Sequence, residues 1–116
     1  MTRLKIKRVY EPRDKTDGQR VLVDRIWPRG IRKESLRDAI WMKELGPSTS
    51  LRQWFGHRPE RWAEFRKRYR AELDAAPEPL TRLRALMKEG GVTLLYSARD
   101  AEHNQAVALR EYLDRR

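Results

Sequence analysis

The apolar run at residues 92–96 constrains the fold of this chain more than any other segment. It comprises Val, Thr, Leu, Leu and Tyr, and it lies between the pair Gly90-Gly91 and a polar stretch. A short apolar run with such boundaries is typical of a buried strand. Residues 21–23, Val-Leu-Val, form a second apolar run, whose two apolar faces favour a parallel strand covered by helices. These segments predict an α/β fold.

Weaker strand patterns lie at two other places. Residues 4–10 alternate partly between apolar and polar side chains and predict a first strand, followed by a polar loop at residues 11–19. Residues 39–43, Ala-Ile-Trp-Met-Lys, fit either a strand or part of a helix, and we favour the strand.

A short helix is expected to begin after Ser48 or Ser50, to run to about Phe55 and to stop at Gly56.

Three longer helices follow, each with an apolar stripe at helical spacing. Pro59 is expected to open the first of them, and Pro77 with Pro79 to separate it from the second. Asp100 is expected to cap the last helix. The residues expected to face inward are Trp62, Phe65, Tyr69 and Leu73, then Leu80, Leu83, Leu86 and Met87, and finally Ala106, Leu109 and Leu113.

The order of these elements predicts a small open, mostly parallel sheet with flanking helices, which is a Rossmann-like α/β fold. We expect a single domain over residues 1–116, because this length fits one hydrophobic core.

The composition excludes several kinds of site. The chain has no cysteine, so disulfides, thiolate metal sites and cysteine nucleophiles are excluded. Its two histidines do not predict a metal site, and it has no glycine-rich phosphate loop, so we expect no metal or cofactor. It also lacks a run of about 20 apolar residues and a signal-peptide core, so we expect a cytoplasmic protein without membrane contact.

The charge is strongly positive, with 27 Lys and Arg against 17 Asp and Glu and a formal net charge of +10. Such a field attracts polyanions, nucleic acid first and then nucleotides and acidic metabolites. Because 38% of the residues are charged and both signs occur, the composition equally fits a well-solvated surface.

Polar side chains follow both apolar strands. Ligands of open α/β sheets bind beyond the carboxyl ends of the strands, so these side chains are expected to share one crevice if the two strands are parallel neighbours. The donor end of the last helix and the forked arginine side chains favour an anion there. The candidate anion-binding residues are Asp24, Arg25 and Arg29 after one strand, with Arg99, Asp100, His103 and Asn104 after the other.

Each of these side chains also has a purely structural interpretation. Asp24 can pair with Arg25 to fix a loop, or act as an acid or base, and Asp100 is explained as a helix cap. Trp27 is a candidate for stacking on a base, but packing against the sheet edge is the favoured interpretation. His57 is a secondary site candidate in a segment that also fits a simple turn.

Four segments resemble the YeaO-like branch of the bacterial domain of unknown function 488 family. They are residues 20–30, 46–57, 65–73 and 93–104, and they keep the family's motif order and spacing. The resemblance implies a compact Rossmann-like α/β domain and no established activity. Other branches carry a cysteine near the end of the last strand, where this chain has Tyr96 and Ser97. The family's motif positions correspond to Asp24, Arg25, Trp27, Pro28, Arg29, Gly30, Pro47, Ser48, Trp54, Phe55, Gly56, His57, His103 and Asn104.

Three functions are consistent with these observations. The first is binding of a phosphate-bearing ligand, a nucleotide or nucleic acid, at the strand ends. The alternative is a non-enzymatic nucleic-acid-binding or protein-interaction module that uses the basic surface. An enzyme with Asp24, His57 or His103 as acid or base has the least support, because no motif fixes a reaction class. The sequence does not indicate an oligomeric state.

Overall fold

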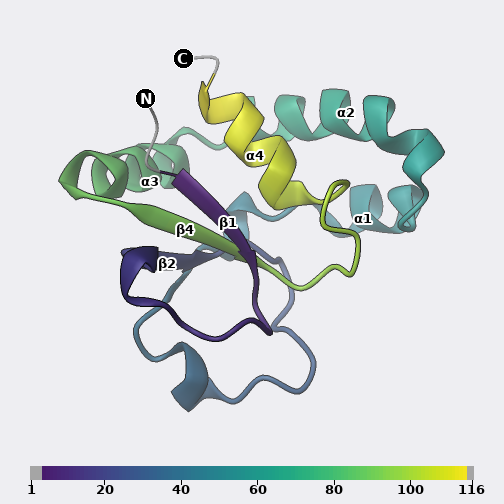
Figure 1. Ribbon diagram of the computed structural model, residues 1–116. Coiled ribbons are helices and arrows are strands. Elements are labelled where there is room, and N and C mark those ends of the chain that lie inside the picture. Colours follow the sequence, from purple (N-terminus) through teal and green to yellow (C-terminus); the bar gives the residue numbers. More distant parts are fainter. Residues whose placement is uncertain (1–3, 115–116) are drawn as a thin grey trace.

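The structure is a computed structural model that describes residues 4–114, and its centre is a four-stranded sheet (Figure 1). All neighbouring strands are parallel, and their order across the sheet is β1-β4-β2-β3. The strands are β1 (Leu4–Arg8), β2 (Gln19–Leu22), β3 (Ile40–Trp41) and β4 (Val92–Tyr96). The predicted α/β class with a parallel sheet is therefore confirmed, and residues 40–41 are a strand as favoured.

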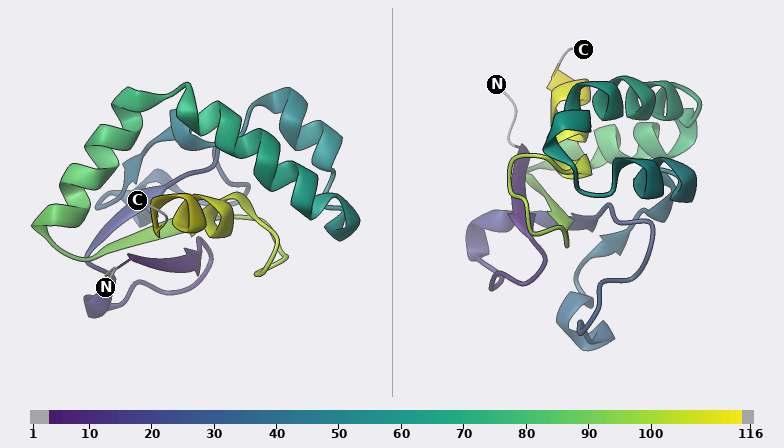
Figure 2. Two further views of the ribbon diagram at one scale, coloured as in Figure 1. Left: turned by 90° about the horizontal axis from the view of Figure 1, so that it is seen from above. Right: turned by 90° about the vertical axis from the view of Figure 1, so that its right-hand side faces the viewer.

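Within residues 4–114, the four α-helices all lie against one face of the sheet (Figures 1 and 2). They are α1 (Thr49–Phe55), α2 (Trp62–Asp74), α3 (Pro77–Glu89) and α4 (Gln105–Asp114). The opposite face is covered by the long connection between β2 and β3, which includes a 3₁₀ turn at Lys33–Leu36. Rossmann-like is thus a loose description, because a doubly wound sheet has helices on both faces.

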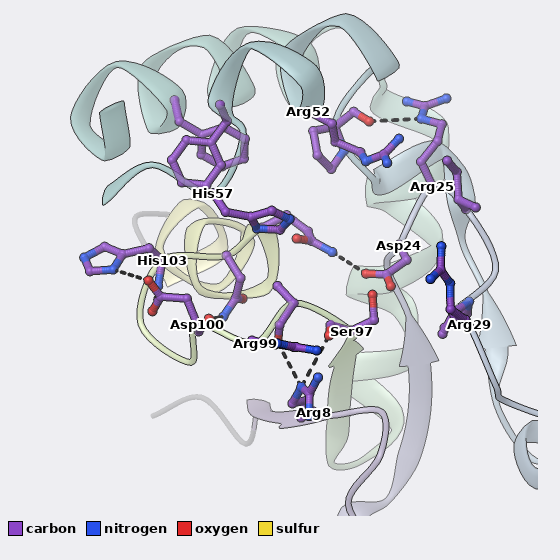
Figure 3. A pocket seen from close by; sticks show the side chains of 18 of the residues that line it. Arg8, Asp24, Arg25, Arg29, Arg52, His57, Ser97, Arg99, Asp100 and His103 are labelled. Carbon is purple, nitrogen blue, oxygen red and sulfur yellow. Dashed lines mark hydrogen bonds and ion pairs between the residues drawn. The ribbon is translucent and has the colours of Figure 1, made fainter. Parts of the chain in front are cut away.

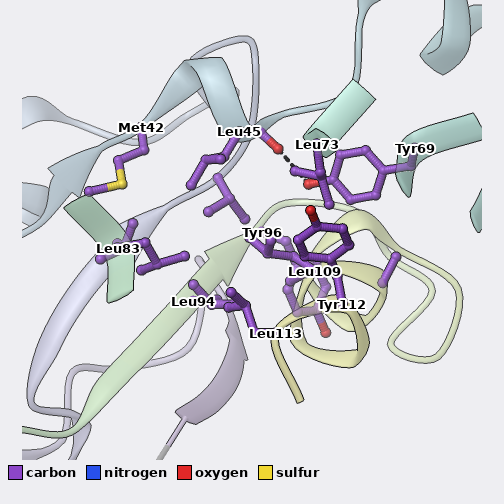
Figure 4. Close-up of a cluster of buried hydrophobic side chains, with 14 of the residues drawn as sticks. Met42, Leu45, Tyr69, Leu73, Leu83, Leu94, Tyr96, Leu109, Tyr112 and Leu113 are labelled. Atoms are coloured by element: carbon purple, nitrogen blue, oxygen red, sulfur yellow. Dashed lines mark hydrogen bonds between the residues drawn. The ribbon is translucent and has the colours of Figure 1, made fainter. Parts of the chain in front are cut away.

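The side chains of β4 alternate between these two layers. Val92, Leu94 and Tyr96 join the core beneath the helices (Figure 4), whereas Leu95 packs with Leu36 in the smaller cluster beneath the connection. All five β4 residues are buried, as expected for a central strand with both faces covered.

Two of the predicted helix boundaries are confirmed. The Ser48 hydroxyl accepts a hydrogen bond from the Leu51 amide at 3.1 Å and caps α1, and Gly56 ends this helix in the left-handed conformation.

Within residues 4–114, no helix has the length and apolar character needed to cross a bilayer.

Two prolines lie differently from the prediction. Pro77 and Pro79 were expected to separate two helices, but α3 begins at Pro77. Proline fits the first turn of a helix because the amides there have no partner within the helix.

Candidate functional site

A hollow of about 1020 Å³ opens at the carboxyl ends of β1, β4 and β2 (Figure 3). Parallel pairing produces it, since Leu22 lies beside Leu95 in the register and Arg8 lies beside Tyr96. Chain segments that follow these three strands therefore meet at one edge of the sheet, together with α1 and the turn after it. The polar residues that line the hollow are Arg8, Tyr10, Asp24, Arg25, Arg29, Arg52, Gln53, His57, Ser97, Arg99, Asp100, His103, Asn104 and Gln105, with Trp27 among the apolar ones.

All nine residues singled out from the sequence as site candidates line this hollow: Asp24, Arg25, Trp27, Arg29, His57, Arg99, Asp100, His103 and Asn104. The structure therefore brings the two strand ends together as expected. Their individual roles differ, because some are fixed by other parts of the protein and some are not.

Two of the five arginines that line the hollow hold backbone segments in place. Arg25 donates from Nη2 to the Gly46 carbonyl at 2.8 Å and from Nε to the Pro47 carbonyl at 3.2 Å. Arg8 donates from Nε to the carbonyls of Ser97 and Ala98 at 3.3 and 3.0 Å. These contacts satisfy carbonyls at the rim, and Arg25 thus fixes the segment before α1 rather than pairing with Asp24.

The other three arginines, Arg29, Arg52 and Arg99, are exposed and come from three separate segments. Among residues 4–114, their side chains make no hydrogen bond or ion pair with another residue. Figure 3 shows Arg52, Arg99 and Arg29 on different sides of Asp24. Their guanidinium donors are therefore available to a ligand.

Asp24 is the buried acid of the site, with 6% of its surface exposed. The Gln105 amide donates to Oδ1, and the Trp41 indole donates to the Asp24 backbone carbonyl at 2.8 Å. Burial raises the pKa of Asp24, and this effect exceeds the opposite effects of hydrogen bonds from Ser97 and Gln105 and of the Arg52 charge.

We expect the substitution Asp24→Asn to stabilise the protein at neutral pH. The pKa of this carboxyl group is higher in the folded than in the unfolded protein. The protein therefore loses free energy of unfolding as pH rises through the folded-state pKa. The neutral amide avoids this loss and keeps an oxygen for Gln105. Thermal unfolding should show a melting temperature a few degrees above wild type at pH 7, and a difference that shrinks as pH falls and is lost by about pH 3.9.

Asp100→Asn is the matched control for this experiment. The Glu102 amide and the His103 side chain lower the pKa of Asp100, so its contribution is present at neutral pH and is lost as pH falls. The two substitutions should therefore change stability at pH 7 in opposite directions. Destabilisation by Asp24→Asn at pH 7 would contradict the effect assigned to burial.

The expectation that Asp100 caps the last helix is wrong. Asp100 Oδ1 accepts hydrogen bonds from the amides of Glu102 and His103 at 2.9 and 3.1 Å, but this turn precedes α4. Asn104 lies directly before the helix, and its Oδ1 accepts from the Val107 amide at 3.0 Å. The true cap is thus Asn104, and His103 also precedes the helix.

The two histidines lie on different walls of the hollow. His103 Nδ1 lies 2.9 Å from Asp100 Oδ2, and its ring contacts the edge of Trp62 with centroids 5.3 Å apart. His57 is exposed, directly follows Gly56 and has a φ of 59°, an uncommon value for a residue other than glycine. The turn position expected for His57 is confirmed. Among the described residues there is no group of three or more side chains suited to a metal ion.

Trp27 packs in the smaller cluster, which supports the favoured structural interpretation. Its ring meets Trp41 edge-on with centroids 5.3 Å apart, and its indole donates to the Ile31 carbonyl at 2.7 Å.

Six polar residues that line the hollow were not among the candidates from the sequence: Arg8, Tyr10, Arg52, Gln53, Ser97 and Gln105. Arg8 ends β1 in the structure, whereas the sequence pattern extended this strand to residue 10 and so placed Arg8 within it. The Arg8 guanidinium lies 4.6 Å from the Tyr10 ring centroid, and the Tyr10 hydroxyl donates to the Arg29 carbonyl at 2.8 Å. No local pattern indicated that Arg52 of α1 or Gln105 of α4 faces the strand ends.

Nearly the whole chain matches a known family. The family model described as "Inactive DUF488-N3 subclade", in which DUF stands for domain of unknown function, matches residues 3–116. The chain belongs to this DUF488 family. The resemblance inferred from the motifs around Asp24, Gly56 and His103 is therefore confirmed.

Relatives of this DUF488 protein are similar over nearly their full length. An uncharacterised protein of Mycobacterium tuberculosis is 47% identical over 116 residues, covering 99% of this chain and 97% of the relative. The uncharacterised protein YeaO of Escherichia coli is 44% identical over 110 residues, covering 95% and 96%. No solved structure matches the chain.

Proposed function

We propose that the hollow binds a small ligand that carries phosphate. The observation that supports this most is the set of three exposed arginines without protein partners, Arg29, Arg52 and Arg99. A guanidinium group offers planar, forked donors that match phosphate oxygens, and charge-assisted hydrogen bonds of this kind are strong.

The charge balance of the hollow favours the same ligand. Five arginines and two aspartates line it, so its formal charge is +3 with both histidines neutral. A concave site lined by one sign of charge concentrates its field and raises the local concentration of counter-ions. A bound phosphate offsets the repulsion among the arginines.

Binding without catalysis is the better supported form of this proposal. The description of the family includes the word inactive. Asp24 is held by Gln105 and Ser97, and His103 is held by Asp100, so these side chains are fixed by the protein itself.

Calorimetric titration with inorganic phosphate, adenosine monophosphate and a short single-stranded DNA tests this proposal. Arg99→Ala should weaken binding about tenfold, because a hydrogen bond to a charged group contributes about 1.5–3 kcal/mol. Arg82→Ala is the matched control, since Arg82 is an exposed arginine of α3 outside the hollow, and its binding should equal that of wild type.

Equal weakening by the two substitutions would indicate binding across the whole basic surface instead. Binding of that kind also falls steeply with salt and shows little preference among ligands. Failure of every phosphate compound to bind wild-type protein would contradict the proposal.

A further inference from the structure

Asp24 is unexpected in a site that otherwise favours anions. Its carboxyl group lies in the hollow among arginines, yet a carboxylate repels a phosphate placed beside it. A site that binds only phosphate would have a higher affinity for it without this carboxylate.

The surroundings of Asp24 do not explain it as half of an ion pair. Within the part of the chain that the structure describes, no arginine or lysine makes an ion pair with its carboxylate, and the Arg52 charge acts on it only from a longer distance. Arg25, the adjacent candidate partner, donates to the carbonyls of Gly46 and Pro47 instead.

Asp24 retains capacity for a further donor. The Gln105 amide donates to its Oδ1, whereas a carboxylate accepts about four hydrogen bonds. Asp100, the other acid of the hollow, has both oxygens engaged, by the amides of Glu102 and His103 and by the His103 ring. Asp24 is therefore the acid that is suited to accept from a ligand.

The dimensions of the hollow point to a ligand larger than phosphate. Its volume of about 1020 Å³ lies at the upper end of the range of pockets for small molecules, which is roughly 300–1,000 Å³. Tyr10 and Ile26 on its lining are 43% and 55% exposed, so apolar surface is also available to a ligand.

We propose that Asp24 accepts hydrogen bonds from sugar hydroxyls of a ribose phosphate whose phosphate group contacts Arg29, Arg52 and Arg99. This inference rests on the proposed function and narrows its ligand to a phosphorylated sugar with free hydroxyls, either a nucleotide or the sugar phosphate itself. An ionised carboxylate is an acceptor with about four lone-pair sites, so it can accept from the hydroxyl groups of a ribose.

The test compares adenosine monophosphate with its 2′,3′-dideoxy analogue by calorimetry on the wild-type protein. We expect the analogue to bind about tenfold more weakly, because it lacks the hydroxyl groups that donate to the remaining acceptor positions of Asp24. Asp24→Asn should weaken binding of adenosine monophosphate to the level of the analogue. Its affinity for inorganic phosphate should stay the same or increase, because a negative charge is removed.

The outcomes separate this inference from the proposed function. Equal binding of the two nucleotides, with inorganic phosphate also bound, would overturn only the role of Asp24. Failure of all three compounds to bind would overturn both proposals. Ribose 5-phosphate shows whether the ligand is a nucleotide or a sugar phosphate. If it binds as tightly as adenosine monophosphate, the site recognises the sugar phosphate alone. If it binds more weakly, the base contributes and the ligand is a nucleotide. If Asp24→Asn fails to fold, the comparison on wild-type protein still decides the question.

Discussion

Gly18→Ala is expected to lower the free energy of unfolding by about 4 kcal/mol or more, which is exceptional for a single substitution. Gly18 has a φ of 66°, in the left-handed region that costs other residues about 1–2 kcal/mol. A Cβ atom at this position would lie 2.2 Å from the carbonyl oxygen of Gly91 and 2.7 Å from the carbonyl carbon. Both are backbone atoms, so no rotamer change relieves the clash.

The clash lies where β2 and β4 begin to pair. The Gln19 amide donates to the same Gly91 carbonyl at 3.0 Å, and this hydrogen bond starts the register that places Asp24 beside Ser97. Relief of the clash must therefore separate the two strands that form the hollow.

Gly30→Ala is the matched control for Gly18→Ala. Gly30 has a φ of 78°, but a Cβ atom there would have no neighbour within 4 Å. We expect Gly30→Ala to lower the free energy of unfolding by only about 1–2 kcal/mol, which is the cost of the left-handed conformation. Urea denaturation followed by circular dichroism compares the two variants, and equal midpoints would contradict the role assigned to the contact with Gly91.

The convergence of the two strand ends could be predicted on the condition that the two strands are parallel neighbours. Residues 21–23 are apolar throughout and residues 92–96 are apolar except for Thr93, which indicated strands buried on both faces and so a parallel sheet. Polar residues that follow two parallel neighbours necessarily reach the same edge of the sheet.

The cover on the second face of the sheet could not be predicted from local patterns. Leu36 and Trp27 lie in a segment without regular apolar spacing, yet they bury Leu22 and Leu95. Only the tertiary structure shows that an irregular connection takes the place of a helix there.

The start of the last helix was ambiguous for a physical reason. Asp100 and Asn104 are both good N-cap residues, and they lie four positions apart. The structure uses both, Asp100 for a turn and Asn104 for the cap, and the Asn104 amide also donates to the Asp100 carbonyl at 2.9 Å. Sequence patterns rank such residues individually and do not show how two adjacent turns divide them.

Reversing two charges in the hollow is expected to have the largest effect on function. The double substitution Arg52→Glu with Arg99→Glu removes two unpaired guanidinium groups and places two carboxylates opposite the phosphate. Loss of charge-assisted hydrogen bonds from both side chains alone corresponds to about 100-fold weaker binding, and the added repulsion increases this. Both side chains are exposed, so the fold should be retained.

The control is Arg37→Glu with Arg82→Glu, which changes the net charge equally at two exposed positions outside the hollow. If phosphate bound the basic surface as a whole, the two double variants would weaken binding alike, because the net charge is the same.

The most direct test is therefore the dissociation constant of adenosine monophosphate, measured by calorimetry at one low ionic strength for wild type and both double variants. We expect Arg52→Glu with Arg99→Glu to bind at least about 100-fold more weakly than wild type, and the control to remain within about threefold of it. Equal affinities in the two double variants, or unchanged binding when Arg52 and Arg99 are reversed, would contradict an anion site at the strand ends.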